Sequence, residues 1–215
     1  ANLTNATWKN AIFAGTDMRG AILDPGASES AELSAANLPR KDPDLLPALR
    51  EILARHAAWI ESAGKRGKRA ELPAVYLPEQ NLRAVNLGSA ILDCVVLTKS
   101  DLTEAELAMA YLTFADLRQA TLDHADLRGA KLHRAMLNGA TLVGANLGPV
   151  AGGSSKKHQW RVNLEHAKFV GAVLNGAILK GVRAIGADFT NADLRDADLS
   201  QADLRQADLS GANLI

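Results

Sequence analysis

Leucine recurs at every fifth position over much of this chain, and this period constrains the fold more than any other feature. From residue 70 to residue 149 the sequence divides into sixteen groups of five, and leucine occupies the middle of each, from Leu72 to Leu147. Alanine usually stands two positions earlier. A period of five fits neither the helical turn of about 3.6 residues nor the alternation of a strand. The backbone must therefore turn back on itself once in every five residues.

The composition fits a regular interior built from small aliphatic side chains. Hydrophobic residues make up 47% of the 215 residues, but aromatic residues only 4%. Compact cores usually mix aliphatic shapes and aromatic rings to fill irregular space, whereas leucine and alanine suit a lattice that repeats. We therefore expect a solenoid, in which each repeat contacts its neighbours along one axis.

Charge and cysteine content argue against several classes of function. The 24 basic and 24 acidic side chains give a formal net charge of zero, which argues against a general nucleic-acid or membrane-surface binder and against a strongly acidic DNA mimic. Cys94 is the only cysteine, so no internal disulfide can form and a reducing, cytoplasmic compartment is expected. No apolar run approaches the roughly 18 residues of a membrane span, so no membrane partner is expected.

The groups of five resemble the pentapeptide-repeat family. The family's motif is alanine, then aspartate or asparagine, then leucine and two variable residues, and it is matched by ADLRG at 125–129 and by ADLSQ at 197–201. The resemblance implies an all-β solenoid, namely a right-handed quadrilateral β-helix with four groups of five in each coil. Leucine and alanine would face inward. About nine coils, spaced by about 4.8 Å, would form a rod about 40 Å long.

Two interruptions divide the repeats into three blocks. Coils are expected at 1–40, 70–149 and 162–215, with a helical insertion at 41–69 and a loop insertion at 150–161. The first two blocks contain eight and sixteen groups of five. Both numbers are multiples of four, so both insertions are expected to leave the square at the same corner, four coils apart. The weak point is the segment 24–30, because Gly26 and Ser28 would occupy inward positions there.

The insertion at 41–69 is expected to contain one α-helix followed by a basic turn. Asp42 or Asp44 can cap such a helix, with Pro43 in its first turn, and Gly64 fits its C-terminal cap. Apolar positions at helical spacing form one stripe along it: Leu45, Leu49, Ile52, Leu53, His56 and Ile60. The basic turn then comprises Lys65, Arg66, Lys68 and Arg69.

Such an apolar stripe needs a surface to cover. When the outward repeat positions are placed on four faces, one face collects Ile22, Ile91, Tyr111 and Phe114. Tyr76 and Val96 fall on the next face. We expect the helix to dock on this outer patch.

Two further regions carry charge. The insertion at 150–161 is rich in glycine and serine, so it is expected to be a loop, basic through Lys156 and Lys157 and anchored by Trp160. The last coils are locally acidic, and their candidate contact residues are Asp193, Asp198, Asp203 and Asp208.

The sequence offers no arrangement typical of an active site. Its histidines have no metal-ligand spacing with a cysteine or with one another. His56 is expected to pack on the helix, and His124, His133 and His166 to face solvent. The aspartates before the central leucines could be paired for acid–base chemistry, but the resemblance assigns that position to a solvent-facing aspartate or asparagine. We predict no catalytic, cofactor-binding or metal-binding residue, and no cofactor.

These observations predict a non-enzymatic scaffold for protein–protein interactions, with a protein partner that the sequence does not identify. The alternative is a DNA mimic that binds or inhibits DNA gyrase or topoisomerase, as in quinolone resistance in the resembled family. Six aspartates against two arginines at 187–215 favour that alternative, and the basic insertion counts against it. Nucleic acid is not an expected partner. Because bare solenoid ends expose leucine and strand edges, we expect either an end-to-end homodimer or a neighbouring domain in a longer chain.

Overall fold

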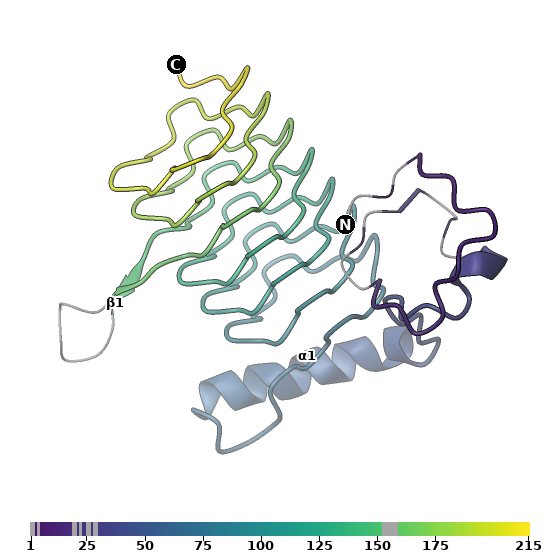
Figure 1. The fold of residues 1–215 in the computed structure, drawn as a ribbon. Helices are drawn as coiled ribbons and strands as arrows, with labels where there is room; N and C mark the ends of the chain where they lie inside the picture. The colour runs from purple at the N-terminus through teal and green to yellow at the C-terminus, as the bar shows by residue number, and fades with distance from the viewer. Residues whose placement is uncertain are drawn as a thin grey trace.

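Coils stacked along one axis make up most of the structure (Figure 1). The computed structural model describes residues 3, 5–18, 21, 23–24, 27, 30–151 and 159–215. Its named elements are the 3-10 helix η2 (Ala31–Leu33), the helix α1 (Leu45–Glu61) and the strands β1 (Val150–Ala151) and β2 (Gln159–Trp160). The helix α1 lies within the segment for which a helix was predicted.

Each complete coil takes twenty residues, because residues twenty positions apart pair as parallel strands. Ile91 pairs with Tyr111, and Tyr111 pairs with Lys131. The Leu92 N–H donates to the Tyr111 carbonyl at 2.8 Å, and the Tyr111 N–H donates to the Ala90 carbonyl at 2.9 Å. Neighbouring coils therefore satisfy each other's backbone groups. The pairing is interrupted at every corner, so these contacts are short bridges rather than long strands.

Leucine fills the interior of the coils. Leu92, Leu112 and Leu132 lie in successive coils at 2%, 1% and 0% exposure. They belong to one hydrophobic cluster together with the alanines that stand two positions before them. Burial of each leucine stabilises the fold by about 1.5–3 kcal/mol. The predicted interior stack of leucines is confirmed.

The backbone turns each corner through a residue in the left-handed region. After Leu112, the Ala115 N–H donates to the Leu112 carbonyl at 3.0 Å, and Phe114 has a φ of 58°. This is the pattern of a four-residue turn whose third residue has positive φ. The Asp116 carboxylate then accepts the Arg118 N–H at 3.2 Å. A side chain that bonds the backbone two residues on favours a turn, which explains why aspartate or asparagine precedes the central leucine.

The helix α1 covers one end of the leucine column. Its buried residues Leu45 and Leu49 belong to the same hydrophobic cluster as the inward leucines, and Ile52 and Leu53 pack against that cluster. The leucines of the adjacent coil are at most 4% exposed: Leu72, Leu77, Leu82 and Leu87. The helix therefore closes the solenoid end that would otherwise expose these side chains (Figure 1).

The prediction that the helix docks on the outer patch is thus wrong. Ile91, Tyr111 and Phe114 do not belong to the cluster that α1 joins, and Ile22 lies outside the described residues. The end of a solenoid presents several leucines at once, whereas an outward column offers single apolar side chains among polar neighbours. The end therefore gains more from being covered.

The two insertions return to the coils at the same corner but leave from different ones. The first insertion leaves after Arg40, which pairs with Val75, and returns at Glu71. The strand of Arg40 lies on the face that follows the face of Glu71, so α1 takes the place of the remaining two faces of that coil. The second insertion follows the strand of Asn146 and returns at Asn163, four coils beyond Glu71 in the same column. The predicted common exit assumed that neither insertion occupies a face. That assumption fails for α1.

The second insertion begins and ends as a pair of strands rather than as a simple loop. Val150 of β1 pairs antiparallel with Trp160 of β2. Trp160, which was predicted to anchor the end of the insertion, lies in β2 and is 57% exposed. Lys156 and Lys157 lie outside the described residues.

The described part of the first block is also coiled. Asp17 pairs with Asn37, and Met18 and Leu33 are buried. This block lies to one side of the main column, next to α1 (Figure 1). Gly26 and Ser28, where the repeat was expected to be weakest, lie outside the described residues.

Candidate interaction surface

Both insertions return to the coils on one face, which we call the first face. It is the column of paired outward residues Glu71, Ile91, Tyr111, Lys131, Asn163, Arg183 and Asp203. Arg69 leads into its first strand, and Trp160 and Arg161 lead into the strand of Asn163. The strands of Ile91, Tyr111 and Lys131 therefore lie between the two insertions.

Tyr111, at the centre of this region, lies between two cations. The Lys131 ammonium is 4.0 Å from the centroid of the Tyr111 ring, and the guanidinium carbon of Arg69 is 5.1 Å from it. The Arg69 Nε also donates a hydrogen bond to the Ser89 carbonyl at 2.6 Å. Lys131, and to a smaller extent Arg69, lowers the pKa of the Tyr111 hydroxyl. Cation–π contacts at exposed sites contribute about 0.5–1 kcal/mol, so they hold positive charge over this face.

The corner that follows the first face carries a row of rings. Phe114 and His133 meet edge to face with 6.0 Å between ring centroids, and His133 and His166 meet in the same way at 6.0 Å. The Arg134 guanidinium lies 5.8 Å from the Phe114 centroid. His133 was predicted to face solvent. Coiling instead places it between two other rings, which the linear sequence does not show.

This corner carries charges of both signs, because Asp93, which accepts the Thr113 N–H, and Glu165 lie there with Arg134 and Arg183. Glu165 accepts a hydrogen bond from the Arg183 Nε at 2.7 Å, and its other carboxylate oxygen is 3.9 Å from the His133 Nδ1. Burial, followed by the charge of Arg134, lowers the pKa of His133 and so favours its neutral imidazole. Glu165 therefore balances Arg183. Arg134 forms no ion pair with any described carboxylate.

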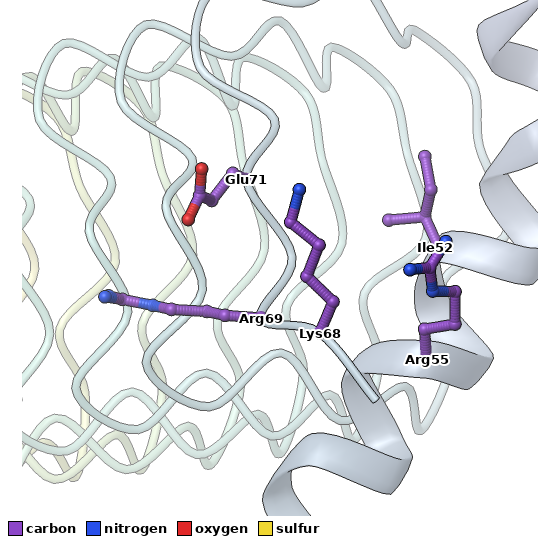
Figure 2. A pocket seen from close by; sticks show the side chains of 5 residues that line it. All are labelled: Ile52, Arg55, Lys68, Arg69 and Glu71. Carbon is purple, nitrogen blue, oxygen red and sulfur yellow. The ribbon is translucent and has the colours of Figure 1, made fainter. Parts of the chain in front are cut away.

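A shallow hollow lies where α1 meets the first face (Figure 2). Its volume is about 170 Å³, and its lining residues are Ile52, Arg55, Lys68, Arg69 and Glu71. Figure 2 shows that Ile52 and Arg55 come from α1, whereas Lys68, Arg69 and Glu71 come from the segment that enters the first coil. Three cations and one carboxylate make the hollow positive. It is smaller than the roughly 300–1,000 Å³ of typical small-molecule sites.

The described residues contain no cluster of histidine, cysteine, aspartate and glutamate that could hold a metal ion. Among the described helices, none has the length and apolar character needed to cross a bilayer.

Comparison with protein-family models finds the repeat over most of the chain. The model for pentapeptide repeats matches in eight copies, and more than half of the chain is covered: residues 1–24, 81–113, 110–148, 161–196 and 192–215. The chain belongs to the pentapeptide-repeat family. Membership implies a right-handed quadrilateral β-helix, which agrees with the coils of twenty residues.

Solved structures resemble this pentapeptide-repeat protein at low identity. Rfr23, a pentapeptide repeat protein from the cyanobacterium Cyanothece 51142, is 20% identical and covers 78% of this chain and 100% of its own, with a TM-score of 0.33. QnrB1, a plasmid-mediated fluoroquinolone resistance protein solved after trypsin treatment, is 20% identical over 69% of this chain and 76% of its own, with a TM-score of 0.35.

HetL, a pentapeptide repeat protein involved in heterocyst differentiation regulation from Nostoc sp. strain PCC 7120, is 26% identical over 74% of this chain and 94% of its own, with a TM-score of 0.19. TM-scores of this size do not extend the likeness beyond the repeat itself. None of the curated proteins compared with the chain matches it.

The predicted acidic residues do not form one surface in this pentapeptide-repeat protein. Asp193, Asp198, Asp203 and Asp208 follow one another at intervals of five, so each lies on a different face of the coil. Each carboxylate accepts the N–H of the residue two positions later, in order Arg195, Ser200, Arg205 and Ser210. Hydrogen bonds from the side chains of the same partners lower the pKa of all four carboxyls. These hydrogen bonds therefore stabilise the turns at the corners of the coil.

Three of the four residues of the predicted basic turn are exposed to solvent. Lys65, Arg66 and Lys68 are exposed, whereas Arg69 is half-buried against Tyr111 and Ser89. Ile91, Tyr111 and Phe114 stay together on or beside the first face, but the side chains packed on Tyr111 and Phe114 are cations and rings rather than a helix. The sequence interpretation missed Lys131 and Arg134. Aligning the chain in rows of twenty would place them next to Tyr111 and Phe114.

Proposed function

We propose that this pentapeptide-repeat protein is a non-enzymatic scaffold for protein–protein interactions, and that the first face, between the two insertions, is its contact surface. One observation supports this most: both departures from the repeat return to the same face. That face also holds Arg69 and Lys131 against an aromatic ring. Closure of the solenoid end accounts for α1, but it does not account for the return of the second insertion to the same face or for these cations, so a contact with another molecule is the better explanation.

The shape of the surface supports binding rather than catalysis. The hollow beside α1 is small, and three of its five lining residues are basic: Arg55, Lys68 and Arg69. Such a hollow offers no dry site in which a titratable group could be strongly perturbed.

The alternative, a DNA mimic directed at gyrase or topoisomerase, receives less support. Duplex DNA carries one charge for every 1.7 Å or so of its axis, so a mimic needs a continuous acidic row. Here the four aspartates lie on four faces, and two of them are paired with Arg195 and Arg205 at 2.6 and 2.8 Å. Inhibition of gyrase supercoiling by the purified chain would revive this alternative.

A binding comparison with matched variants tests the scaffold proposal. The full chain is immobilised, candidate partners are retained from a lysate, and each is then purified and titrated against the wild type. A first-face variant, Tyr111→Ser with Lys131→Ser, is compared with Thr121→Ser with Thr141→Ser on another face. We expect saturable binding that the first-face variant loses and the control retains. Failure of every purified candidate to bind, or equal binding by both variants, would contradict the proposal.

A further inference from the structure

Lys131 of the first face and Arg134 at the corner that follows it differ from other cations of the repeat in what they contact. Elsewhere an arginine that follows the central leucine pairs with the aspartate that precedes it: Arg118 with Asp116 at 2.6 Å, Arg128 with Asp126 at 2.6 Å and Arg195 with Asp193 at 2.6 Å. Lys131 and Arg134 lie over the rings of Tyr111 and Phe114 instead. Neither they nor Arg69 forms an ion pair with a carboxylate in the described part of the chain.

The repeat explains why this charge stays uncompensated. Lys131 stands in the position before the central leucine, where the motif places aspartate or asparagine, so the usual carboxylate is missing from its coil. Arg134 is the left-handed corner residue, two positions after the leucine, with a φ of 56°. From that corner it contacts the Phe114 ring instead of a carboxylate. Positive charge therefore gathers where the local pairing of the coil does not neutralise it.

The spacing of these cations suits an extended chain. Neighbouring coils are about 4.8 Å apart, and alternate side chains of an extended strand are about 6.8 Å apart. Arg69 and Lys131 both contact the ring of Tyr111, and Arg134 lies at the adjoining corner. Two or three carboxylates on one side of an extended segment could each reach one of these cations. Apolar side chains of the same extended segment, next to its carboxylates, would contact Ile91, which is half-buried.

We infer that the first face binds an acidic, extended segment of a partner protein, whose carboxylates pair with Arg69, Lys131 and Arg134. This inference rests on the proposed scaffold function and adds the chemistry of the partner. A nucleic acid fits less well, because Glu71 and Glu165 stand within the same surface and would repel a continuous row of phosphates. A peptide can place neutral or basic residues opposite these two carboxylates.

Fluorescence anisotropy with the full chain tests the inference. The probe is a short fluorescein-labelled peptide of alternating glutamate and serine with one central tyrosine. A lysine-for-glutamate peptide and a single-stranded DNA of similar length serve as comparisons. We expect the wild type to bind the acidic peptide, with an affinity that falls as salt rises. Lys131→Glu and Arg134→Glu should each weaken binding about tenfold or more, because charge reversal replaces an attraction with a repulsion.

Lys99→Glu is the matched control. Lys99 is an exposed corner residue between two other faces, so its reversal should change the affinity by less than about twofold if only contacts at the first face matter. Unchanged thermal unfolding of each variant shows that the fold is intact. No binding of the acidic peptide, equal loss with Lys99→Glu, or tighter binding of the DNA would overturn the inference. A purified protein partner whose binding is insensitive to Lys131→Glu would overturn it as well, and would leave the scaffold proposal standing.

Discussion

Acidification is expected to loosen α1 from the end of the solenoid, through His56. This side chain is 0% exposed, its Nδ1 accepts the Ala70 N–H at 3.0 Å, and its ring stacks on Trp59 with 5.6 Å between centroids. Protonation of the His56 Nδ1 would place its new N–H against the Ala70 N–H, so that two hydrogen-bond donors would face each other, and it would bury a positive charge. Burial is the main cause that lowers the pKa of His56; the nearby Arg69 also lowers it, and the Gly88 carbonyl opposes the shift.

The expected loss of stability follows from the direction of this shift. An unfolded histidine has a pKa of about 6.5, and the folded value lies below it, so the unfolded chain binds the proton more readily. The contribution of His56 is therefore complete above about pH 6.5. It falls by at most about 1.4 kcal/mol for each pH unit below that, until the folded pKa is reached. Between pH 7.5 and pH 5.5 the free energy of unfolding should fall by up to about 1.4 kcal/mol.

Urea unfolding followed by tryptophan fluorescence measures this loss, with Trp59 as a probe beside His56. His56→Asn keeps an acceptor for the Ala70 N–H but does not titrate in this range, so its stability should change less between the two pH values. His133→Asn is the control for the other described histidine with a lowered pKa; it should remove a smaller part of the loss, because His133 is partly exposed. If the wild type and His56→Asn lose the same stability, the reasoning about this interface is refuted.

Two further perturbations test the packing. Leu132→Ala removes a side chain that is fully buried between two coils and should cost about 2–5 kcal/mol, whereas Lys131→Ala beside it should cost less than about 1 kcal/mol; similar thermal destabilisation by both would contradict the interior stack. Gly67→Ala should destabilise the chain more than Gly171→Ala, although both glycines have positive φ (73° and 63°). A Cβ at Gly67 would meet the Arg55 carbonyl and lie 2.8 Å from the Trp59 nitrogen, whereas none of the surroundings of Gly171 comes within 4 Å. Equal unfolding midpoints would contradict the close approach of this turn to α1.

The five-residue period determines which side chains face inward, and for this reason the interior could be predicted residue by residue. Leu112 is buried because every residue at its position of the repeat points to the axis. The place where α1 docks could not be predicted in the same way. Periodicity identifies its apolar stripe but does not choose between the solenoid end and an outward patch, and that choice depends on how much apolar surface each presents.

Only some residues of the candidate surface could be predicted from the sequence, because the contacts between them follow a period of twenty residues rather than five. Tyr111 and Phe114 stood out as apolar residues at outward positions. Their partners Lys131 and Arg134, twenty residues later, become neighbours only once the coil closes after four groups of five. The same geometry separates Asp193 from Asp198, which are close in sequence but lie on different faces.

The twenty-residue coil can be tested most directly by disulfide formation between paired positions. In a Cys94→Ser background, cysteines replace Thr121 and Thr141, which pair in adjacent coils at the spacing of about 4.8 Å that a disulfide accepts. A second variant carries cysteines at Thr121 and Met136, whose strands lie on different faces. After mild oxidation and mass measurement, the first variant should be cross-linked within the chain and the second should keep its thiols. Free thiols in the first variant, or cross-linking of the second, would contradict the coil and with it the first face.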